Sequence, residues 1–164
     1  VTAPVLGFIG CEWERKGLRR VLEILRAIPE AKLIIAGVPR EEIARLLEGL
    51  ENRVELLGWV KDPNEFYSRI RLLIHPAKLE AYGMVVPEAL ARGIGVLVSK
   101  ATGAATEVGT AGRVLPHTSP KEQWIQAARD LLTNPSGEYP SPRTWAEVAA
   151  DYEALYTRNP LITL

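Results

Sequence analysis

Cysteine is nearly absent from the sequence, and the charges of the chain cancel. Cys11 is the only cysteine among 164 residues, which excludes an internal disulfide, and no paired cysteine and histidine spacing indicates a structural zinc site. The 20 basic side chains are matched by 20 acidic ones, which argues against the broad positive surface that nucleic acid requires. We therefore expect no nucleic-acid partner and no metal, and any anion site must be local.

Long apolar runs are missing as well. No stretch approaches the ~20 apolar residues that a membrane-spanning helix needs, and the N-terminus lacks the basic region and apolar core of a signal peptide. We expect a soluble domain in the cytoplasm, where a lone cysteine stays reduced. The chain begins at Val1 without methionine and enters an apolar run almost at once, which predicts a piece of a longer protein.

The remaining composition is that of one globular domain, with 47% apolar and 24% charged residues. Short apolar runs alternate with stretches whose apolar residues recur at helical spacing. Parallel strands need crossover connections, and each connection here contains a helical stretch. The pattern predicts an α/β fold, a Rossmann-like three-layer α/β/α sandwich whose mostly parallel sheet has about six strands, at residues 5–10, 31–37, 53–58, 72–74, 95–99 and 112–115.

Two common nucleotide sites are not expected in this fold. After the first strand the sequence has neither the glycine triplet of a dinucleotide site nor a Walker lysine loop. The sequence therefore gives little support to NAD binding or to P-loop ATP binding.

Several helix starts carry recognisable signals. Pro39 and Pro87 are expected to open two helices, because proline is favoured in the first helical turn. Asp62 is expected to cap a helix that contains Phe66, Tyr67 and Ile70 on its apolar face, and Ser119 to cap another as part of a capping box.

The C-terminal part differs in composition from the rest. Residues 134–142 form a proline-rich linker, and a closing helix is expected within residues 140–160. Trp145, Tyr152 and Tyr156 recur in that helix at spacings of seven and four residues. We expect these aromatic side chains to pack on the sheet rather than to reach toward a domain that precedes this one.

The stretch that carries the strongest chemical signal follows the fourth strand. Glu80 precedes a glycine, Gly83, and Glu88 lies just inside the next helix. A carboxylate can accept hydrogen bonds from neighbouring sugar hydroxyls, and the free backbone N–H groups of Gly83, Met84 and Val85 suit a phosphate. Together they favour a nucleotide-sugar site, although taken alone Glu88 could be a first-turn acid and Glu80 an exposed loop residue.

A basic cluster follows the first strand. Arg15 and Lys16 come just before a helix, where cations are unfavourable unless an anion binds nearby. We expect Arg19 and Arg20 to be a solvated basic pair.

The spacing of Glu80, Gly83 and Glu88, together with the sequence 88–98 that follows, resembles the retaining glycosyltransferases of family 4. The resemblance runs almost end to end and implies the C-terminal half of a two-domain GT-B fold. It implies that Glu80 faces the donor sugar and phosphates, that Glu88 holds the ribose, and that Lys16 of the Lys-Gly pair binds the diphosphate.

The same resemblance implies further assignments. Arg15 would assist Lys16, and the loop with Trp59 and Val60 would line the base pocket through backbone groups, with the Trp59 side chain packing rather than stacking on the base. Catalysis would rest on Glu80 and Lys16, without metal or other cofactor. Residues 1–164 would form the nucleotide-sugar-binding domain, inactive alone, because the acceptor domain that precedes it is absent.

Within the family, Phe8-Ile9-Gly10 with Arg15-Lys16-Gly17 and His75-Pro76-Ala77 with Glu80 look most like lipopolysaccharide-core glucosyltransferases that use UDP-glucose. That similarity implies transfer to the hydroxyl of a glycan or glycolipid acceptor, with retention of configuration, by a protein that can associate peripherally with the inner face of the cytoplasmic membrane.

Some residues depart from the family pattern or leave alternatives open. Cys11 stands where many members have an arginine, which could weaken diphosphate binding, and Gly95 replaces a frequent proline. His75 either borders the donor pocket or is structural, whereas His117 is expected at the surface. A non-catalytic nucleotide-sensing or scaffold domain and a related UDP-sugar epimerase remain as other functions.

Overall fold

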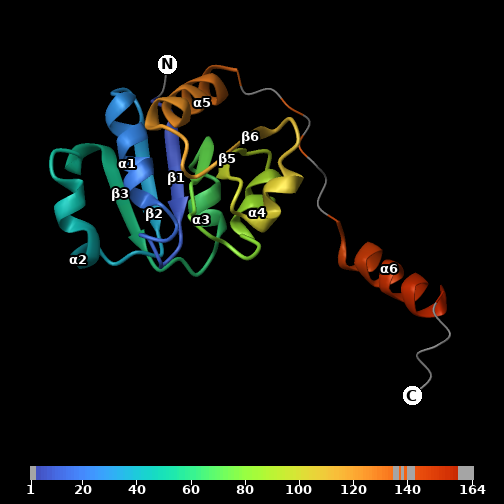
Figure 1. The fold of residues 1–164 in the computed structure, drawn as a ribbon. Helices are drawn as coiled ribbons and strands as arrows, with labels where there is room; N and C mark the ends of the chain where they lie inside the picture. Colours follow the sequence, from blue (N-terminus) through green and yellow to red (C-terminus); the bar gives the residue numbers. More distant parts are fainter. Residues whose placement is uncertain (1–2, 135–136, 138, 140–142, 159–164) are drawn as a thin grey trace.

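The fold is described by a computed structural model that covers residues 3–134, 137, 139 and 143–158. Six strands alternate with helices along the chain (Figure 1). The strands are β1 (Val5–Ile9), β2 (Lys32–Ala36), β3 (Val54–Gly58), β4 (Leu72–His75), β5 (Gly95–Ser99) and β6 (Gly112–Leu115). The α-helices are α1 (Leu18–Ala27), α2 (Arg40–Ile43), α3 (Asn64–Tyr67), α4 (Val85–Leu90), α5 (Lys121–Thr133) and α6 (Trp145–Arg158). The 3₁₀ turns are η1 (Ala44–Leu47), η2 (Glu51–Arg53) and η3 (Gly103–Glu107).

All six strands are parallel and lie in the order β3-β2-β1-β4-β5-β6. This confirms the predicted fold class and the position of each strand. The chain moves outward from β1 through β2 to β3, then returns to β4 on the other side of β1 and moves outward again. The sheet therefore has a topological switch point between β1 and β4, and in open α/β sheets ligands bind outside the carboxyl ends of the strands at this point.

Side chains that alternate along the strands form two apolar cores, one on each face of the sheet. Leu6 and Phe8 of β1 belong to the core beneath α1 and α5, together with Trp124. Leu73 of β4 belongs to the opposite core with Phe66, beneath α3 and α4. Because both faces are covered, the strands read as continuous apolar runs, which is why they could be located from the sequence.

Some helix boundaries differ from those expected. The helix after β2 is α-helical only to Ile43 and continues as the 3₁₀ turn η1. Helix α3 ends at Tyr67 rather than reaching Ile70, although the Asp62 carboxylate does accept a 2.9 Å hydrogen bond from the Asn64 N–H at its start.

Two more helix starts need correction. Helix α4 begins at Val85, two residues before Pro87, which is tolerated because the first N–H groups of a helix have no intrahelical acceptor. Helix α5 begins at Lys121 without a side-chain cap, so the expected capping box at Ser119 is not formed.

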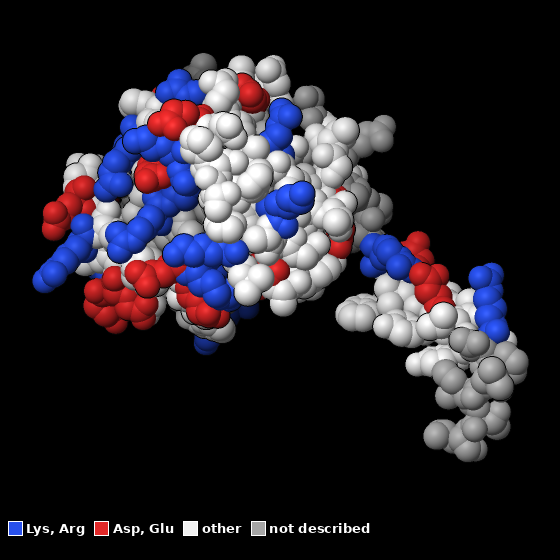
Figure 2. All heavy atoms as spheres, in the orientation of Figure 1, with Lys and Arg blue, Asp and Glu red and all other residues white. Residues whose placement is uncertain are grey.

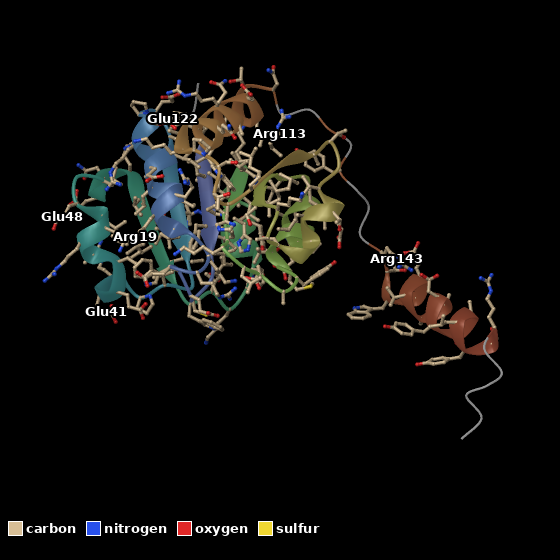
Figure 3. The ribbon with its side chains drawn as sticks, viewed as in Figure 1. Arg19, Glu41, Glu48, Arg113, Glu122 and Arg143 are labelled. Atoms are coloured by element: carbon tan, nitrogen blue, oxygen red, sulfur yellow. The ribbon has the colours of Figure 1, made fainter. Side chains whose placement is uncertain are left out.

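Helix α6 does not pack on the sheet, and that expectation was wrong. Its described residues include none that are buried, and Trp145 is 88% exposed. Helix α6 lies apart from the sandwich (Figure 1), and its side chains, which are drawn in Figure 3, do not reach the sandwich. Six residues of the expected linker, 135–136, 138 and 140–142, lie outside the described residues. Among the described helices, none has the length and apolar content to cross a membrane.

Candidate functional site

The loops that follow β1 and β4 are in direct backbone contact at the switch point. The N–H of Lys78 donates a 2.9 Å hydrogen bond to the carbonyl of Arg15. Gly17 has a left-handed backbone, with φ of +83°, and a Cβ there would lie 2.4 Å from the carbonyl oxygen of Pro76. Only glycine combines this conformation with so close an approach. Gly17 therefore allows the two loops to approach each other this closely.

Lys16, Arg15 and Glu80 converge at this contact. The Lys16 Nζ lies 3.0 Å from Oε2 of Glu80, and the Arg15 guanidinium lies 3.5 Å from the same oxygen. The side chains of Lys16 and Glu80 are each only 14% exposed. Arg15 is also held by the Glu12 carboxylate and donates to the carbonyl of Leu79. The two cations thus share the largely buried carboxylate of Glu80, which lies on the loop that was expected to face a donor.

This arrangement determines the charge of the site. Burial raises the pKa of Glu80, but the hydrogen bond and charge of Lys16, with the charge of Arg15, outweigh it and hold that pKa below its usual value. The hydrogen bond to Glu12 raises the pKa of Arg15, so the guanidinium stays charged. At neutral pH the cluster therefore contains two cations, Arg15 and Lys16, and the carboxylate of Glu80. The carboxylate of Glu12, which pairs with Arg15, adds a second negative charge.

His75, the last residue of β4, lies beneath the same carboxylate. Its side chain is buried, and Nε2 is 3.8 Å from Oε2 of Glu80 without a hydrogen-bond partner. Burial, together with the charge of Lys16, lowers the pKa of His75 to about 4, and the charge of Glu80 offsets this only in part. The imidazole is therefore neutral at pH 7. His75 is both buried at the end of β4 and adjacent to Glu80, so the structure is compatible with either of the two interpretations left open for it.

The loop from Gly83 to Val85 presents backbone donors. No protein acceptor among the described residues takes a hydrogen bond from the N–H groups of Gly83, Met84 or Val85. Gly83 has φ of +85°, and a Cβ there would lie 2.7 Å from Cγ2 of Thr102. Helix α4 has only six residues, so an anion here would be bound by individual N–H groups rather than by a long helix dipole.

Glu88 is held by a residue that sequence reasoning did not single out as functional. The buried phenol of Tyr67 donates a 2.7 Å hydrogen bond to Oε2 of Glu88. Burial and this hydrogen bond raise the pKa of Tyr67, so it remains a donor. Arg92 lies over the Tyr67 ring, 4.8 Å from its centroid, and donates to the carbonyl of Glu88. Tyr67 was expected only as an apolar residue of its helix.

The expected base pocket lies at the same edge of the sheet, after β3. Trp59 is 82% exposed, so the expectation that its side chain packs against the protein was wrong. Val60 is partly buried. The N–H of Gly37, after β2, donates a 2.6 Å hydrogen bond to the carbonyl of Gly58 and ties the two loops together. The structure does not bring Trp59 or Val60 into contact with Glu80.

Other candidate features lie elsewhere. A hollow of about 810 Å³ is lined by Val5 and Arg71, at the opposite, amino-terminal edge of the sheet. Arg19 is solvated as expected, since its side chain is 64% exposed even though it pairs with Glu14, whereas Arg20 is only 24% exposed and pairs with Glu23. The visible face of the sandwich carries basic and acidic residues side by side (Figure 2). The described residues contain no group of three His, Cys, Asp or Glu side chains that could hold a metal ion.

The six-stranded parallel sheet defines a Rossmann-like domain of the kind that forms half of a GT-B glycosyltransferase. Charged side chains and unbonded backbone N–H groups lie on the loops at its switch point. Residues 3–134 match the family model described as glycosyl transferases group 1. The chain belongs to this family.

A curated relative is similar in sequence, and two solved structures share the fold. The lipopolysaccharide glucosyltransferase WaaG of Escherichia coli K12 is 32% identical over 163 residues, which cover 91% of this chain and 42% of WaaG. The structure of Anabaena Alr3699/HepE in complex with UDP-glucose matches with a TM-score of 0.73 at 23% identity, over 90% of this chain and 44% of HepE. The C-terminal domain of LpcC from Francisella tularensis matches with a TM-score of 0.66 at 21% identity, over 91% of this chain and 86% of that domain.

The coverage differs among these relatives. The chain spans less than half the length of WaaG and HepE, but most of the LpcC domain.

Proposed function

We propose that residues 1–164 form the donor-binding C-terminal domain of a GT-B glycosyltransferase and bind a nucleoside diphosphate sugar, with a UDP-sugar favoured. The observation that carries this proposal is the convergence of Lys16, Arg15 and Glu80 beside the loop of unbonded N–H groups at Gly83 to Val85. Two cations and several backbone N–H donors are complementary to the negative charge of a diphosphate, and the adjacent carboxylate is able to accept hydrogen bonds from sugar hydroxyls.

The proposed mechanism is stabilisation of the leaving group. Negative charge develops on the diphosphate as the bond to the anomeric carbon breaks, and preorganised donors aimed at that charge lower the barrier. Lys16 and Arg15 supply cations, and the N–H groups near Gly83 supply dipoles. Glu80 orients the donor sugar or its phosphates, and Glu88 holds the ribose hydroxyls. This scheme needs neither a metal nor another cofactor.

Two relatives support the proposed donor and pathway. WaaG is a lipopolysaccharide glucosyltransferase by name, and HepE was crystallised with UDP-glucose. We therefore propose that the whole protein transfers a sugar, with retention, to a hydroxyl of a glycan or glycolipid in cell-envelope or lipopolysaccharide synthesis. The acceptor would bind to an N-terminal domain that lies outside this chain, so the 164 residues alone should bind donor weakly and transfer no sugar.

Titration calorimetry with UDP, GDP, ADP and UDP-glucose tests the proposal. We expect a preference for one diphosphate, with affinity reduced tenfold to hundredfold by Lys16→Ala and by Glu88→Ala, because each removes a charge-assisted contact of about 1.5 to 3 kcal/mol. Lys32→Ala is the matched control, since Lys32 is exposed and begins β2 at the opposite edge of the sheet. Indifference to both site substitutions would favour a scaffold domain.

A further inference from the structure

Unpartnered buried polar atoms gather around Gly83. Among the described residues, three buried side-chain atoms lack a hydrogen-bond partner, and these are Nε2 of His75, Oγ1 of Thr102 and Nε1 of Trp124. Two of the three belong to residues that surround Gly83, where a Cβ would lie 2.7 Å from Thr102 and 3.7 Å from Nε2 of His75. Native proteins rarely leave such groups without a partner. Their concentration beside the candidate site indicates that the site gains contacts when it is occupied.

Glu80 is the group that His75 can reach. The distance of 3.8 Å between Nε2 and Oε2 of Glu80 is too long for a hydrogen bond. The same oxygen instead lies 3.0 Å from the Nζ of Lys16. The carboxylate therefore stands between two donors and is bonded to the charged one.

A diphosphate would change this balance, on the proposed function that this inference rests on. Phosphate oxygens would take Lys16 and Arg15, and the negative charge of Glu80 would then lie against a second negative charge. We propose that His75 is a positioning residue, whose Nε2–H donates a hydrogen bond to the Glu80 carboxylate when the diphosphate displaces that carboxylate from Lys16. The carboxylate then stays beside the donor sugar while the lysine serves the phosphates.

A neutral donor suits this task better than a cation. Because burial keeps the imidazole uncharged, it attracts Glu80 less strongly than Lys16 does in the empty site. Once the phosphates occupy both Lys16 and Arg15, the neutral imidazole, whose Nε2 is 3.8 Å from Oε2 of Glu80, can take the carboxylate. The order of preference thus follows from the charges of the two donors.

A double-mutant cycle in UDP binding tests the role of His75 through Glu80. By calorimetry on this chain, we expect His75→Leu to weaken UDP binding tenfold to hundredfold, because Glu80 then keeps competing for Lys16. In a Glu80→Gln background, the same substitution should change affinity less than threefold. His75→Gln, which keeps a side-chain N–H, should stay near the wild type. His117→Leu, at the exposed second histidine, is the matched control.

The outcomes separate the two proposals. Equal effects of His75→Leu in both backgrounds would overturn the positioning role and leave the proposed function intact, whereas absence of UDP binding by the wild type would overturn both. If His75→Leu does not fold, the two histidines of the wild type can be followed by ¹⁵N NMR. A shift of the His75 Nε2 signal on UDP addition is then expected, and an unchanged signal contradicts the inference.

Discussion

Replacing Glu80 by glutamine should lower stability and at the same time tighten the binding of UDP. The substitution keeps the shape of the side chain but removes the charge that lies 3.0 Å from Lys16 and 3.5 Å from Arg15. In the empty protein this charge stabilises the two cations. In the occupied protein it would repel the diphosphate, so the two effects have opposite signs.

The magnitudes follow from the burial of the pair. A hydrogen bond to a charged group contributes about 1.5 to 3 kcal/mol, and glutamine retains a weaker neutral bond, so we expect a loss of about 2 kcal/mol. For a domain of this size that corresponds to a fall in Tm of about 4 to 8 °C. Two unit charges at about 4 Å interact by roughly 4 kcal/mol near a protein surface. Removing the repulsion between Glu80 and the diphosphate needs to recover only about a third of this energy to tighten UDP binding tenfold.

Differential scanning calorimetry and UDP titration measure both effects on the same samples. Glu12→Gln is the matched control, because Glu12 also pairs with Arg15, at 2.8 Å, but is 59% exposed. Exposed pairs contribute little, so this variant should keep its Tm and its UDP affinity. An unchanged Tm together with weaker UDP binding in Glu80→Gln would show that the carboxylate neither stabilises the cations nor competes with the diphosphate.

Three other predictions test the surroundings of the cluster. Tyr67→Phe removes the 2.7 Å hydrogen bond to Glu88 and should weaken UDP binding about threefold to tenfold. The affinity for 2′,3′-dideoxy-UDP, measured by calorimetry, should not change. Equal losses of affinity for both ligands would contradict a ribose role of Glu88. Because the pKa of His75 is about 4 when folded and about 6.5 when unfolded, the unfolded chain takes up a proton first as pH falls. Stability should therefore be full above pH 6.5 and drop by about 3 kcal/mol towards pH 4; urea titrations at several pH values should show this slope, reduced in His75→Gln, and an equal slope in both proteins would refute it. Gly17→Ala should lose more stability than Gly49→Ala. A Cβ at Gly17 would lie 2.4 Å from a carbonyl oxygen of the loop after β4, whereas Gly49 has φ of +76° but nothing within 4 Å of its Cβ position. Equal losses in urea titrations would show that only the backbone conformation matters.

The strands could be predicted from the sequence because both faces of the sheet are buried. A run such as Leu72 to Ile74 has no polar face, so it can lie only inside a covered parallel sheet, and the structure confirms it. Strand order was beyond the sequence, because nothing in the runs tells which neighbours pair. The 3₁₀ turn η1 was also missed, since its apolar spacing satisfies a continuous α-helix equally well.

The site could be predicted in part. Lys16 and Glu80 were expected at one donor site because the family resemblance assigns both residues to it, and the structure brings them together. Tyr67 was not found, because an aromatic residue within an apolar helix face reads as core until its hydroxyl is seen to donate to a carboxylate. The exposure of Trp59 and of α6 was missed for the opposite reason, since an apolar side chain is expected to be buried unless a partner outside the chain covers it.

The two glutamates of the central loop differ in what holds them, and this difference bears on their proposed roles. Glu80 pairs with cations that a diphosphate would claim, whereas Glu88 accepts from a neutral, buried phenol that no phosphate attracts. Binding would therefore require Glu80 to change partner but leave Glu88 in place. A ribose contact can be preorganised in the empty protein, because its carboxylate is held by a neutral phenol rather than by the cations that a diphosphate would bind, while the sugar contact forms only as the diphosphate arrives. The seven residues between the acids separate a fixed contact from a mobile one, with the amide loop between them.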